Sequence, residues 1–537
     1  MSVARPPHGQ PDKARTGSRS LQRKRRREQE RASRRTLVPA QAPGMLGFDL
    51  RATLRRVPRA AWICALIALL NATAWGIITP LFQGKDEIDN YSYVEYLSAA
   101  GKLPEKAHLS GEEPYSQKLT LVTQGLRYFQ VRFTPFEHSL TTNAEQKTLT
   151  EDVNRAPSLE GHGEAGRVAT EPPGYYALAA IPYALGGSNI LVKLQLMRLL
   201  GALLAALTAL LTFYFLREIL PGVPWAATVG ALCVALQPLF VSSSAIVSPD
   251  ALLFTACAAV FLCFALAFRR GFDTRLAIVT GVVIAVGFTS KVNYVGVAVG
   301  VYMGLAVLAI HEFKSRRWGA LRAPAIAGAI GIAPVALFTL RNALTNNPAT
   351  GGSVPLGGGQ LSPATVLKEL SYSWQLFFPR LPGMTSYFKG VFPLREIWFD
   401  RSVGFYGWMD TTFPTWVDNV ALVLAAVVAM LCVRELLVRR DALRGRLAEI
   451  AAYGAIVVGV LLMLGVSSYH CDLIEHECSL GEPRYLLPLL PLFGAAIVLA
   501  IRGAGRRWAP AVGVAMVMLF LGHDLVSQLQ TIARYYG

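Results

Sequence analysis

Charged residues are scarce in this sequence. Of its 537 residues only 16% are charged and 53% are hydrophobic, whereas an ordinary soluble domain carries roughly 25% charged residues. Apolar runs of about 18 residues or more, each able to cross a hydrocarbon core about 30 Å thick, recur from Ala60 to Val526. A soluble core does not need so many uniformly apolar segments. The composition therefore excludes an ordinary soluble protein and predicts an all-α polytopic membrane protein.

Cysteine is also rare, and most of it lies in apolar runs. Five of the seven cysteines fall there and are most simply small buried residues. Cys471 and Cys478 instead lie in the polar loop HCDLIEHEC, where a disulfide would require an oxidising compartment. The neighbouring His470 and His476 leave a metal site as the alternative. Because the spacing matches no common zinc pattern, the disulfide is favoured.

Negative charge is scarcer than positive charge, and the net charge is +17. Much of the excess lies in residues 1–59, in runs such as RKRRR, and the rest recurs in short loops between apolar runs. This distribution is typical of topology determinants that contact anionic lipid headgroups, and it needs no nucleic-acid partner. About 60 polar residues before the first apolar run are too many for a signal-peptide n-region. We expect residues 1–59 to form a disordered basic cytoplasmic tail.

Eleven membrane spans are predicted by the apolar runs. They are residues 60–82, 190–216, 224–244, 250–268, 275–290, 293–311, 321–340, 417–437, 449–468, 484–501 and 508–526. The short apolar piece 172–187 has a proline near its start and another inside it. If it does not cross, the basic tail and the basic loops share one face, as the positive-inside rule prefers. We therefore expect a cytoplasmic N-terminus in a multi-pass plasma-membrane protein, with this piece as a juxtamembrane or re-entrant helix on the outer side.

Two large outer loops follow from this topology, at about residues 81–188 and 341–415, and residues 527–537 form a short outer tail. The domain from 60 to 526 thus combines transmembrane helices with juxtamembrane helices on its outer face. The sequence lacks an internal repeat, which weakens a secondary-transporter interpretation.

The first outer loop opens with an acidic cluster, Asp86, Glu87 and Asp89. Carboxyl groups where the chain leaves the bilayer are partly desolvated and crowd each other, which raises pKa values and suits one of them to general-base work. A solvated loop start or an acidic first helical turn is the alternative. Asp250 follows Ser-Pro and is a good helix start on local grounds. The topology nevertheless places Asp250 on the same face as Asp86.

Several basic residues on this outer face depart from the positive-inside pattern. Each of them alone can simply extend to lipid headgroups, but converging cations would make a phosphate site, with Arg favoured for bidentate contact. Together, beside an acidic cluster, they suggest a lipid-phosphate substrate. They are Lys193, Arg198, Lys291, Arg341 and Arg484.

At these residues the chain resembles the GT-C superfamily of membrane glycosyltransferases, and most of all the branch called domain-of-unknown-function family 2142. The resemblance covers about residues 60–502. It rests on an ordered series of motifs: the acidic pair followed by YVEYLSAAGKLP, then EPPGYYAL, LMRLLGALLAALTALLTFYFLREILPG, QPLFVSSSAIVSPDALL, FYGWMDTTFPTWV and EPRYLLPLLPLF. Glu171 stands where the superfamily usually has Gln, and the Arg-rich tail is atypical.

The resemblance implies that Asp86 or Glu87 matches the catalytic acidic position and Asp250 the second acidic position. It further implies transfer of a sugar from a polyprenyl-phosphate carrier to a cell-envelope acceptor on the outer face. The expected substrate-binding residues are Arg198, Lys291, Arg341, Arg484 and Tyr485. Since Arg and Lys can neutralise a monophosphate leaving group, no cofactor is required, although a divalent cation remains an alternative. The competing functions are a flippase or transporter of lipid-linked sugars and a non-catalytic envelope assembly protein.

Overall fold

The fold described below is that of the unit Pro58–Gly537, which is separate from the residues before it. The computed structural model describes residues 57–104, 115–134, 143–155, 168–223, 225–316, 321–344, 363–388, 394–408, 410–470 and 481–537. The predicted basic tail up to residue 56 and the predicted Cys471–Cys478 disulfide lie outside these residues.

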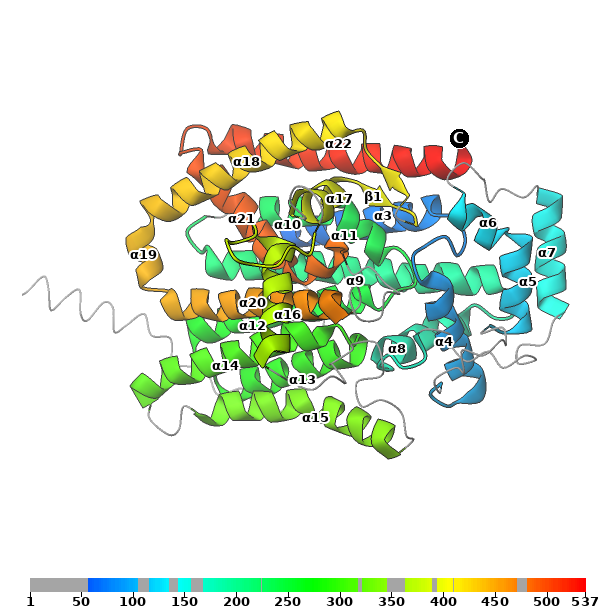
Figure 1. Ribbon diagram of the computed structural model, residues 1–537, viewed down its shortest axis with the longest axis horizontal. Helices are drawn as coiled ribbons and strands as arrows, with labels where there is room; N and C mark the ends of the chain where they lie inside the picture. The colour runs from blue at the N-terminus through cyan, green and yellow to red at the C-terminus, as the bar shows by residue number, and fades with distance from the viewer. Residues whose placement is uncertain are drawn as a thin grey trace, which may run out of the picture. The chain divides into compact units, whose positions relative to one another are not determined.

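Nine helices in the described residues are long and apolar enough to cross a membrane. They are α3 (Arg59–Ile78), α9 (Ile190–Ile219), α12 (Asp250–Arg270), α14 (Tyr294–Arg316), α15 (Arg322–Leu344), α18 (Thr415–Val438), α20 (Leu447–Tyr469), the 3-10 helix η5 (Pro483–Leu489) continued by α21 (Leu490–Gly503), and α22 (Ala509–Tyr536). Most of them run roughly along the long axis of the view in Figure 1.

Of two further apolar segments, one is bent and the other is shorter than the nine long helices. Helices α10 (Ala226–Ala235) and α11 (Pro238–Ser244) meet at an angle of 61°, because Pro238 has no N–H to donate and disfavours helical backbone at Gln237. Helix α13 (Thr274–Ser290) has 17 residues, about 25 Å at 1.5 Å per residue. Each of the eleven predicted spans thus coincides with a helix or with the bent pair, and the predicted fold class is confirmed.

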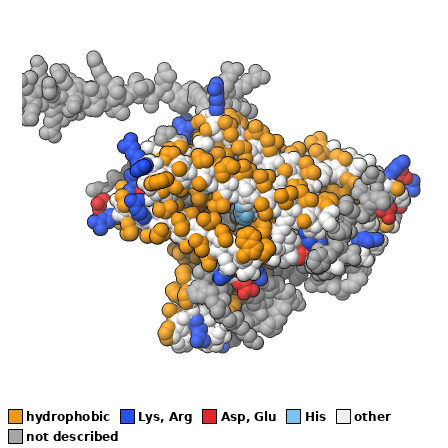
Figure 2. Space-filling model, turned by 90° about the horizontal axis from the view of Figure 1, so that it is seen from above, with side chains coloured by type: hydrophobic (Ala, Val, Ile, Leu, Met, Phe, Trp, Pro, Cys, Tyr) orange, Lys and Arg blue, Asp and Glu red, His pale blue; other side chains and the backbone are white. Residues whose placement is uncertain are grey.

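The surface of the long helices is apolar. In α18 only 6% of the apolar window is buried, and Val423 and Met430 are each 64% exposed. Figure 2 shows hydrophobic side chains spread over much of one face of the molecule. A helix that is apolar all round and faces outward is stable only in a lipid environment, so this surface fits a membrane.

Short helices gather at one end of the bundle, opposite the basic helix α19 (Arg440–Arg444) (Figure 1). They are α4 (Glu87–Ala100), α5 (Gln117–Gly125), α6 (Tyr128–Phe133), α7 (Asn143–Arg155) and α8 (Gly174–Leu185). Helix α8 covers the predicted juxtamembrane piece; at 12 residues it is about 18 Å long and too short to cross.

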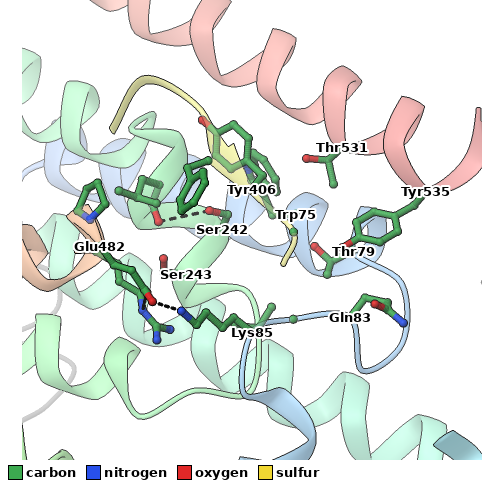
Figure 3. A pocket seen from close by; sticks show the side chains of 17 residues that line it. Trp75, Thr79, Gln83, Lys85, Ser242, Ser243, Tyr406, Glu482, Thr531 and Tyr535 are labelled. Carbon is green, nitrogen blue, oxygen red and sulfur yellow. Dashed lines mark hydrogen bonds and ion pairs between the residues drawn. The ribbon is translucent and has the colours of Figure 1, made fainter. Parts of the chain in front are cut away.

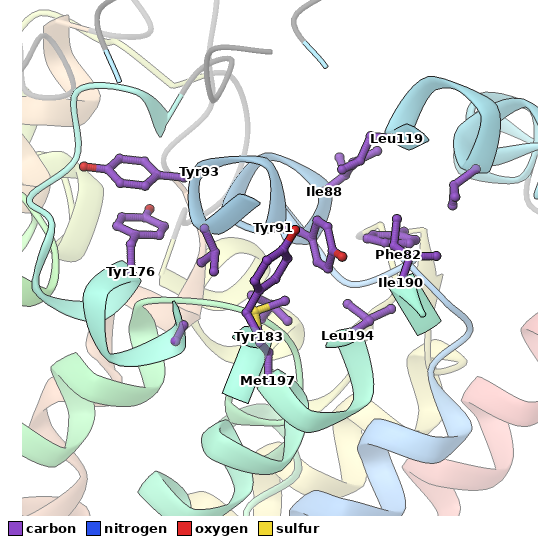
Figure 4. Close-up of a cluster of buried hydrophobic side chains, with 14 of the residues drawn as sticks. Phe82, Ile88, Tyr91, Tyr93, Leu119, Tyr176, Tyr183, Ile190, Leu194 and Met197 are labelled. Carbon is purple, nitrogen blue, oxygen red and sulfur yellow. The ribbon is translucent and has the colours of Figure 1, made fainter. Parts of the chain in front are cut away.

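Aromatic packing fixes α4 on α8. Tyr93 stacks on Tyr176 with 3.7 Å between ring centroids, and Figure 4 shows the two rings lying against each other. The Tyr176 hydroxyl also donates to Asn90 Oδ1 at 2.9 Å. Since α4 directly follows Asp86, these contacts determine where the acidic cluster lies.

The second large loop contributes α16 (Pro363–Phe377), the π-helix η3 (Leu394–Asp400), α17 (Arg401–Val403) and a small antiparallel pair, β1 (Phe405–Tyr406) with β2 (Thr411–Thr412). Residues 527–537, expected to form a short tail, continue α22 as far as Tyr536. Arg534 explains the continuation, because it pairs with Asp410 at 2.7 Å and donates to the Val131 carbonyl at 2.9 Å.

Helix α5 is tied to α4 by a buried carboxyl group. Ser116 caps α5 by accepting from the Leu119 N–H, and its hydroxyl donates to Glu95 Oε2 at 2.7 Å. Burial raises the pKa of Glu95 to about 7, although Ser116 and nearby lysines oppose the shift. A carboxyl group whose pKa is higher in the folded than in the unfolded protein stabilises the fold. This contribution is fully present at a pH below the unfolded pKa, and it is lost as the pH rises through the folded pKa.

We expect Glu95→Gln to abolish this pH dependence. As the pH rises from about 4.5 to above 7, wild type should lose about 3 kcal/mol of unfolding free energy that Glu95→Gln does not lose. The measurement is detergent-induced unfolding at several pH values. Glu151→Gln, on the exposed surface of α7, is the control, and parallel pH profiles for Glu95→Gln and wild type would contradict the expectation.

Candidate active site

Asp86 lies at the turn between α3 and α4 in an unusual backbone conformation. Its φ is 57° and its ψ 11°, in the left-handed region that side chains other than glycine rarely adopt and that Asp tolerates better than most. It precedes the first residue of α4, yet its side chain makes no capping hydrogen bond. The carboxylate instead accepts from Arg484 Nη2 at 3.0 Å. Backbone strain of this kind costs about 1–3 kcal/mol and is concentrated at functional sites.

Arg484 joins three carboxylates. Besides Asp86, its guanidinium lies 3.6 Å from Asp250 Oδ2 and 2.7 Å from Glu482 Oε2. Asp250 is the first residue of α12, and Glu482 directly precedes η5. The side chain of Arg484 is only 10% exposed, so these charges interact in a medium that screens them less than water does.

Two lysines complete the charged network. Lys291 Nζ donates to Asp250 Oδ1 at 2.7 Å, from the extended residue that ends α13. Lys85 pairs with Glu482, and burial together with the nearby Arg484 lowers the pKa of Lys85 to about 8. We call Lys85, Asp86, Asp250, Lys291, Glu482 and Arg484 the Asp86 network.

The network keeps Asp86 ionised. The raised pKa expected from the sequence is wrong for Asp86: partial burial alone would raise it, but the charges of Arg484, Lys85 and Lys291 outweigh this effect and hold the pKa below its usual value. Glu171 at the edge of the network behaves in the opposite way. Burial raises its pKa against the opposing charge of Lys291, while its Oε2 accepts from the Val292 N–H at 2.9 Å.

Glu87 and Arg198 form a separate buried pair. Arg198 donates to both carboxylate oxygens of Glu87, at 2.8 and 2.6 Å, and to the carbonyls of Gly76, Thr79 and Pro80. Glu87 Oε1 also accepts from the Val247 N–H at 3.0 Å. The pair therefore joins the end of α3, α9 and the α11–α12 connection, an arrangement suited to holding the backbone.

The remaining candidates, Arg341 and Tyr485, lie beside Lys291. Arg341 lines an apolar pocket with Lys291, Pro173 and Phe288, and the empty volume of this pocket is about 1080 Å³. The ring centroid of Tyr485 lies 5.8 Å from Lys291 Nζ and 5.2 Å from Arg484 Cζ. The structure thus brings Asp86, Asp250, Lys291, Arg484 and Tyr485 together, places Arg341 in the adjoining pocket, and pairs Glu87 with Arg198.

No metal centre is visible in the described ranges, where no group of three or more His, Cys, Asp or Glu side chains is arranged to hold an ion. The carboxylates of the Asp86 network are paired with Arg and Lys instead. Metal independence of the reaction stays a prediction from the sequence.

A second pocket borders the network at Lys85, Glu482 and Arg484 (Figure 3). Its empty volume is about 640 Å³, and α3, α11, β1, η5 and α22 all contribute to its wall. Two pockets of different character therefore adjoin one charged network, the apolar one at Lys291 and the more polar one at Arg484.

The sequence matches the family model described as "Predicted membrane protein (DUF2142)" over residues 69–493. The chain belongs to this family. No curated protein matches it. Among solved structures it is similar to the oligosaccharyltransferase of Archaeoglobus fulgidus in the apo form, with a TM-score of 0.40 and 13% identity over 88% of this chain and 56% of that chain.

The matched range of this DUF2142 protein includes the Asp86 network. Sequence reasoning did not name two members of the network, Lys85 and Glu482, and it named Glu171, which borders the network, only as a departure from the usual Gln. Each had a signal in its neighbours, since Lys85 precedes Asp86, Glu171 precedes Pro-Pro-Gly-Tyr-Tyr, and Glu482 precedes Pro483-Arg484. Charged residues in polar loops are usually solvated, so these signals become informative only with the ion pairs.

Proposed function

We propose that this DUF2142 protein is a membrane glycosyltransferase that moves a sugar from a polyprenyl-phosphate carrier to a cell-envelope acceptor, with Asp86 as general base. The observation that carries the proposal is the contact of Asp86 with Arg484, which joins an ionised carboxylate to a set of largely buried cations. A base for the nucleophile and a binding site for a phosphate leaving group are what this transfer requires.

In the proposed reaction an acceptor hydroxyl attacks the anomeric carbon of the donor sugar. Its proton passes to Asp86, the bond between that carbon and the phosphate oxygen breaks, and the polyprenyl phosphate leaves with the electron pair. Lys291 and Arg484 would stabilise the charge that develops on the phosphate. Their fixed ion pairs preorganise them, because little rearrangement is then needed during the reaction.

The apolar pocket at Lys291 and Arg341 suits the carrier lipid. Pro173, Phe288 and Phe338 supply apolar surface to it, and the two cations can contact a phosphate at the head of an isoprenoid chain. In this proposal the pocket takes the phosphate and the first isoprenoid units. A divalent ion could add to the neutralisation, but the chemistry does not depend on one.

Sidedness follows from charge in this proposal. With the basic tail cytoplasmic and bound to anionic lipid, the end that carries α4–α8 and the Asp86 network faces the non-cytoplasmic side of the plasma membrane. A lipid-linked sugar exposed there would meet the site directly. No nucleic acid takes part.

We expect the purified protein in lipid nanodiscs to release polyprenyl phosphate from a polyprenyl-phosphate hexose or pentose when an acceptor is supplied. Lys291→Gln should lower this release by tenfold or more, since a charge-assisted contact to phosphate contributes about 1.5–3 kcal/mol. Lys193→Gln is the matched control, because Lys193 lies over the Tyr183 ring, 3.9 Å from its centroid, outside the network.

The same preparation separates the competing functions. Movement of lipid-linked sugars across the bilayer without release of lipid phosphate would indicate a flippase. Neither release nor movement with any donor would favour a non-catalytic assembly protein. Either result would contradict the proposed transfer reaction.

A further inference from the structure

The pocket in Figure 3 has a mixed aromatic and polar lining. The rings of Trp75, Tyr406 and Tyr535 line it, as do the hydroxyls of Ser242 and Ser243. These residues come from α3, β1, α22 and α11, which are far apart in the sequence. We call this cavity the aromatic pocket.

We propose that the aromatic pocket binds a neutral sugar ring beside Asp86; the assignment of that sugar to transfer rests on the proposed function. Sugar rings present C–H faces, which pack on aromatic rings, and hydroxyl edges, which hydrogen-bond to hydroxyl and amide groups. The pocket supplies both kinds of surface. An isoprenoid chain in the pocket would leave the polar groups of the lining without hydrogen-bond partners, which costs free energy.

Gln83 gives the proposal its second, independent support. Its side chain lines the pocket and is 0% exposed. The Trp408 indole N–H donates to Gln83 Oε1 at 3.1 Å, so the amide cannot be flipped without setting two donors against each other. Within the described residues its Nε2 is buried and has no hydrogen-bond partner.

An unpartnered buried donor calls for an explanation. Leaving one without an acceptor destabilises the folded protein, and nearly all buried polar groups in proteins are satisfied. Because Nε2 has no accessible surface, a small movement of the Gln83 side chain must open it to the aromatic pocket, where a ligand oxygen would supply the missing acceptor. A sugar hydroxyl or ring oxygen accepts such a bond without bringing charge.

The charges at the edge of the pocket also favour a neutral ligand. Lys85 pairs with Glu482, and Arg484 binds both Glu482 and Asp86. The two cations and the two carboxylates balance in charge, so the edge of this pocket offers no net positive charge to an anionic ligand. Arg484 both lines the pocket and donates to Asp86, which links a sugar held there to the proposed base.

The test is binding of methyl glycosides of hexoses and pentoses to the protein in nanodiscs, measured by saturation-transfer NMR and calorimetry without a lipid donor. Wild type should bind at least one of them. Gln83→Leu and Gln83→Glu should each weaken binding about tenfold, the effect of losing one hydrogen bond worth about 1.4 kcal/mol. Gln83→Glu keeps the acceptor for Trp408, so a shared loss in both variants is attributable to Nε2.

Ser92→Ala is the matched control. Ser92 also carries a buried oxygen without a hydrogen-bond partner among the described residues, but it lies on α4 outside the pocket lining. Glycoside binding should be unchanged in this variant. No glycoside binding by wild type, or wild-type affinity in both folded Gln83 variants, would overturn the proposal.

Transfer kinetics identify which sugar occupies the pocket. If the Gln83 variants raise the KM for the acceptor alone, the pocket holds the acceptor ring. If they raise the KM for the donor alone, the pocket holds the donor ring. Unchanged KM values for both, with transfer intact, would refute the pocket assignment and leave the transferase proposal standing. Glycoside binding that depends on Gln83 in a protein without transfer activity would refute the transferase and retain the sugar site.

Discussion

Asp86→Asn is expected to lower the rate of sugar transfer by about 10²–10⁴-fold, the usual contribution of a general base. The change removes the proton acceptor but retains shape, and the amide oxygen can still accept from Arg484, which holds Asp86 at 3.0 Å in the wild type. Folding should therefore be affected little. The measurement is the initial rate of polyprenyl-phosphate release at saturating donor and acceptor, normalised to folded protein.

Asp89→Asn is the control for this experiment. Asp89 belongs to the same acidic cluster but accepts from the Tyr115 hydroxyl at 3.0 Å, and it should leave the rate within a few-fold of wild type. The pH profile gives a second measurement. Because the cations around Asp86 hold its pKa below the usual value, the acidic limb assigned to it should lie below the ordinary carboxyl pKa of about 3.9. Normal transfer by well-expressed Asp86→Asn would eliminate Asp86 as the base.

The long helices could be predicted because the bilayer imposes a simple requirement on sequence. A span needs about 20 apolar residues in a row, so each run identifies a helix without knowledge of its neighbours. The sequence does not predict the bend at Pro238, since residues 224–244 are largely apolar and are expected to form one span. Apolar composition determines whether a segment can enter the membrane, whereas the break at Gln237 depends on backbone hydrogen bonding.

The proximity of Asp86, Asp250, Lys291 and Arg484 was suggested by topology, which placed the ends of several spans on one face. Topology does not show which of two adjacent residues joins the site. Asp86 and Glu87 are adjacent in sequence, yet the left-handed backbone at Asp86 and the start of α4 at Glu87 lead their carboxylates to different arginines. Only the three-dimensional pairing distinguishes a carboxylate in the network from one bound by Arg198.

The buried Glu87–Arg198 pair supports the second large prediction, which concerns stability. Arg198→Met should lower the free energy of unfolding by about 3–5 kcal/mol, because it leaves a carboxylate with 0% exposure without its counter-ion. It also removes the donors to the carbonyls of Gly76, Thr79 and Pro80. Glu87→Gln should cost less, since the amide oxygen can still accept from Arg198. Unfolding of the purified variants in mixed micelles measures both effects.

Transfer by the folded fraction distinguishes this role from catalysis. If Glu87 holds the backbone, Glu87→Gln should be less stable than wild type but should transfer sugar at a rate within a few-fold per folded molecule. Asp86→Asn should show the reverse pattern, with normal stability and little transfer. Should Glu87→Gln instead be as stable as wild type and inactive, the base would be Glu87, and the contact between Asp86 and Arg484 would serve only to position the loop.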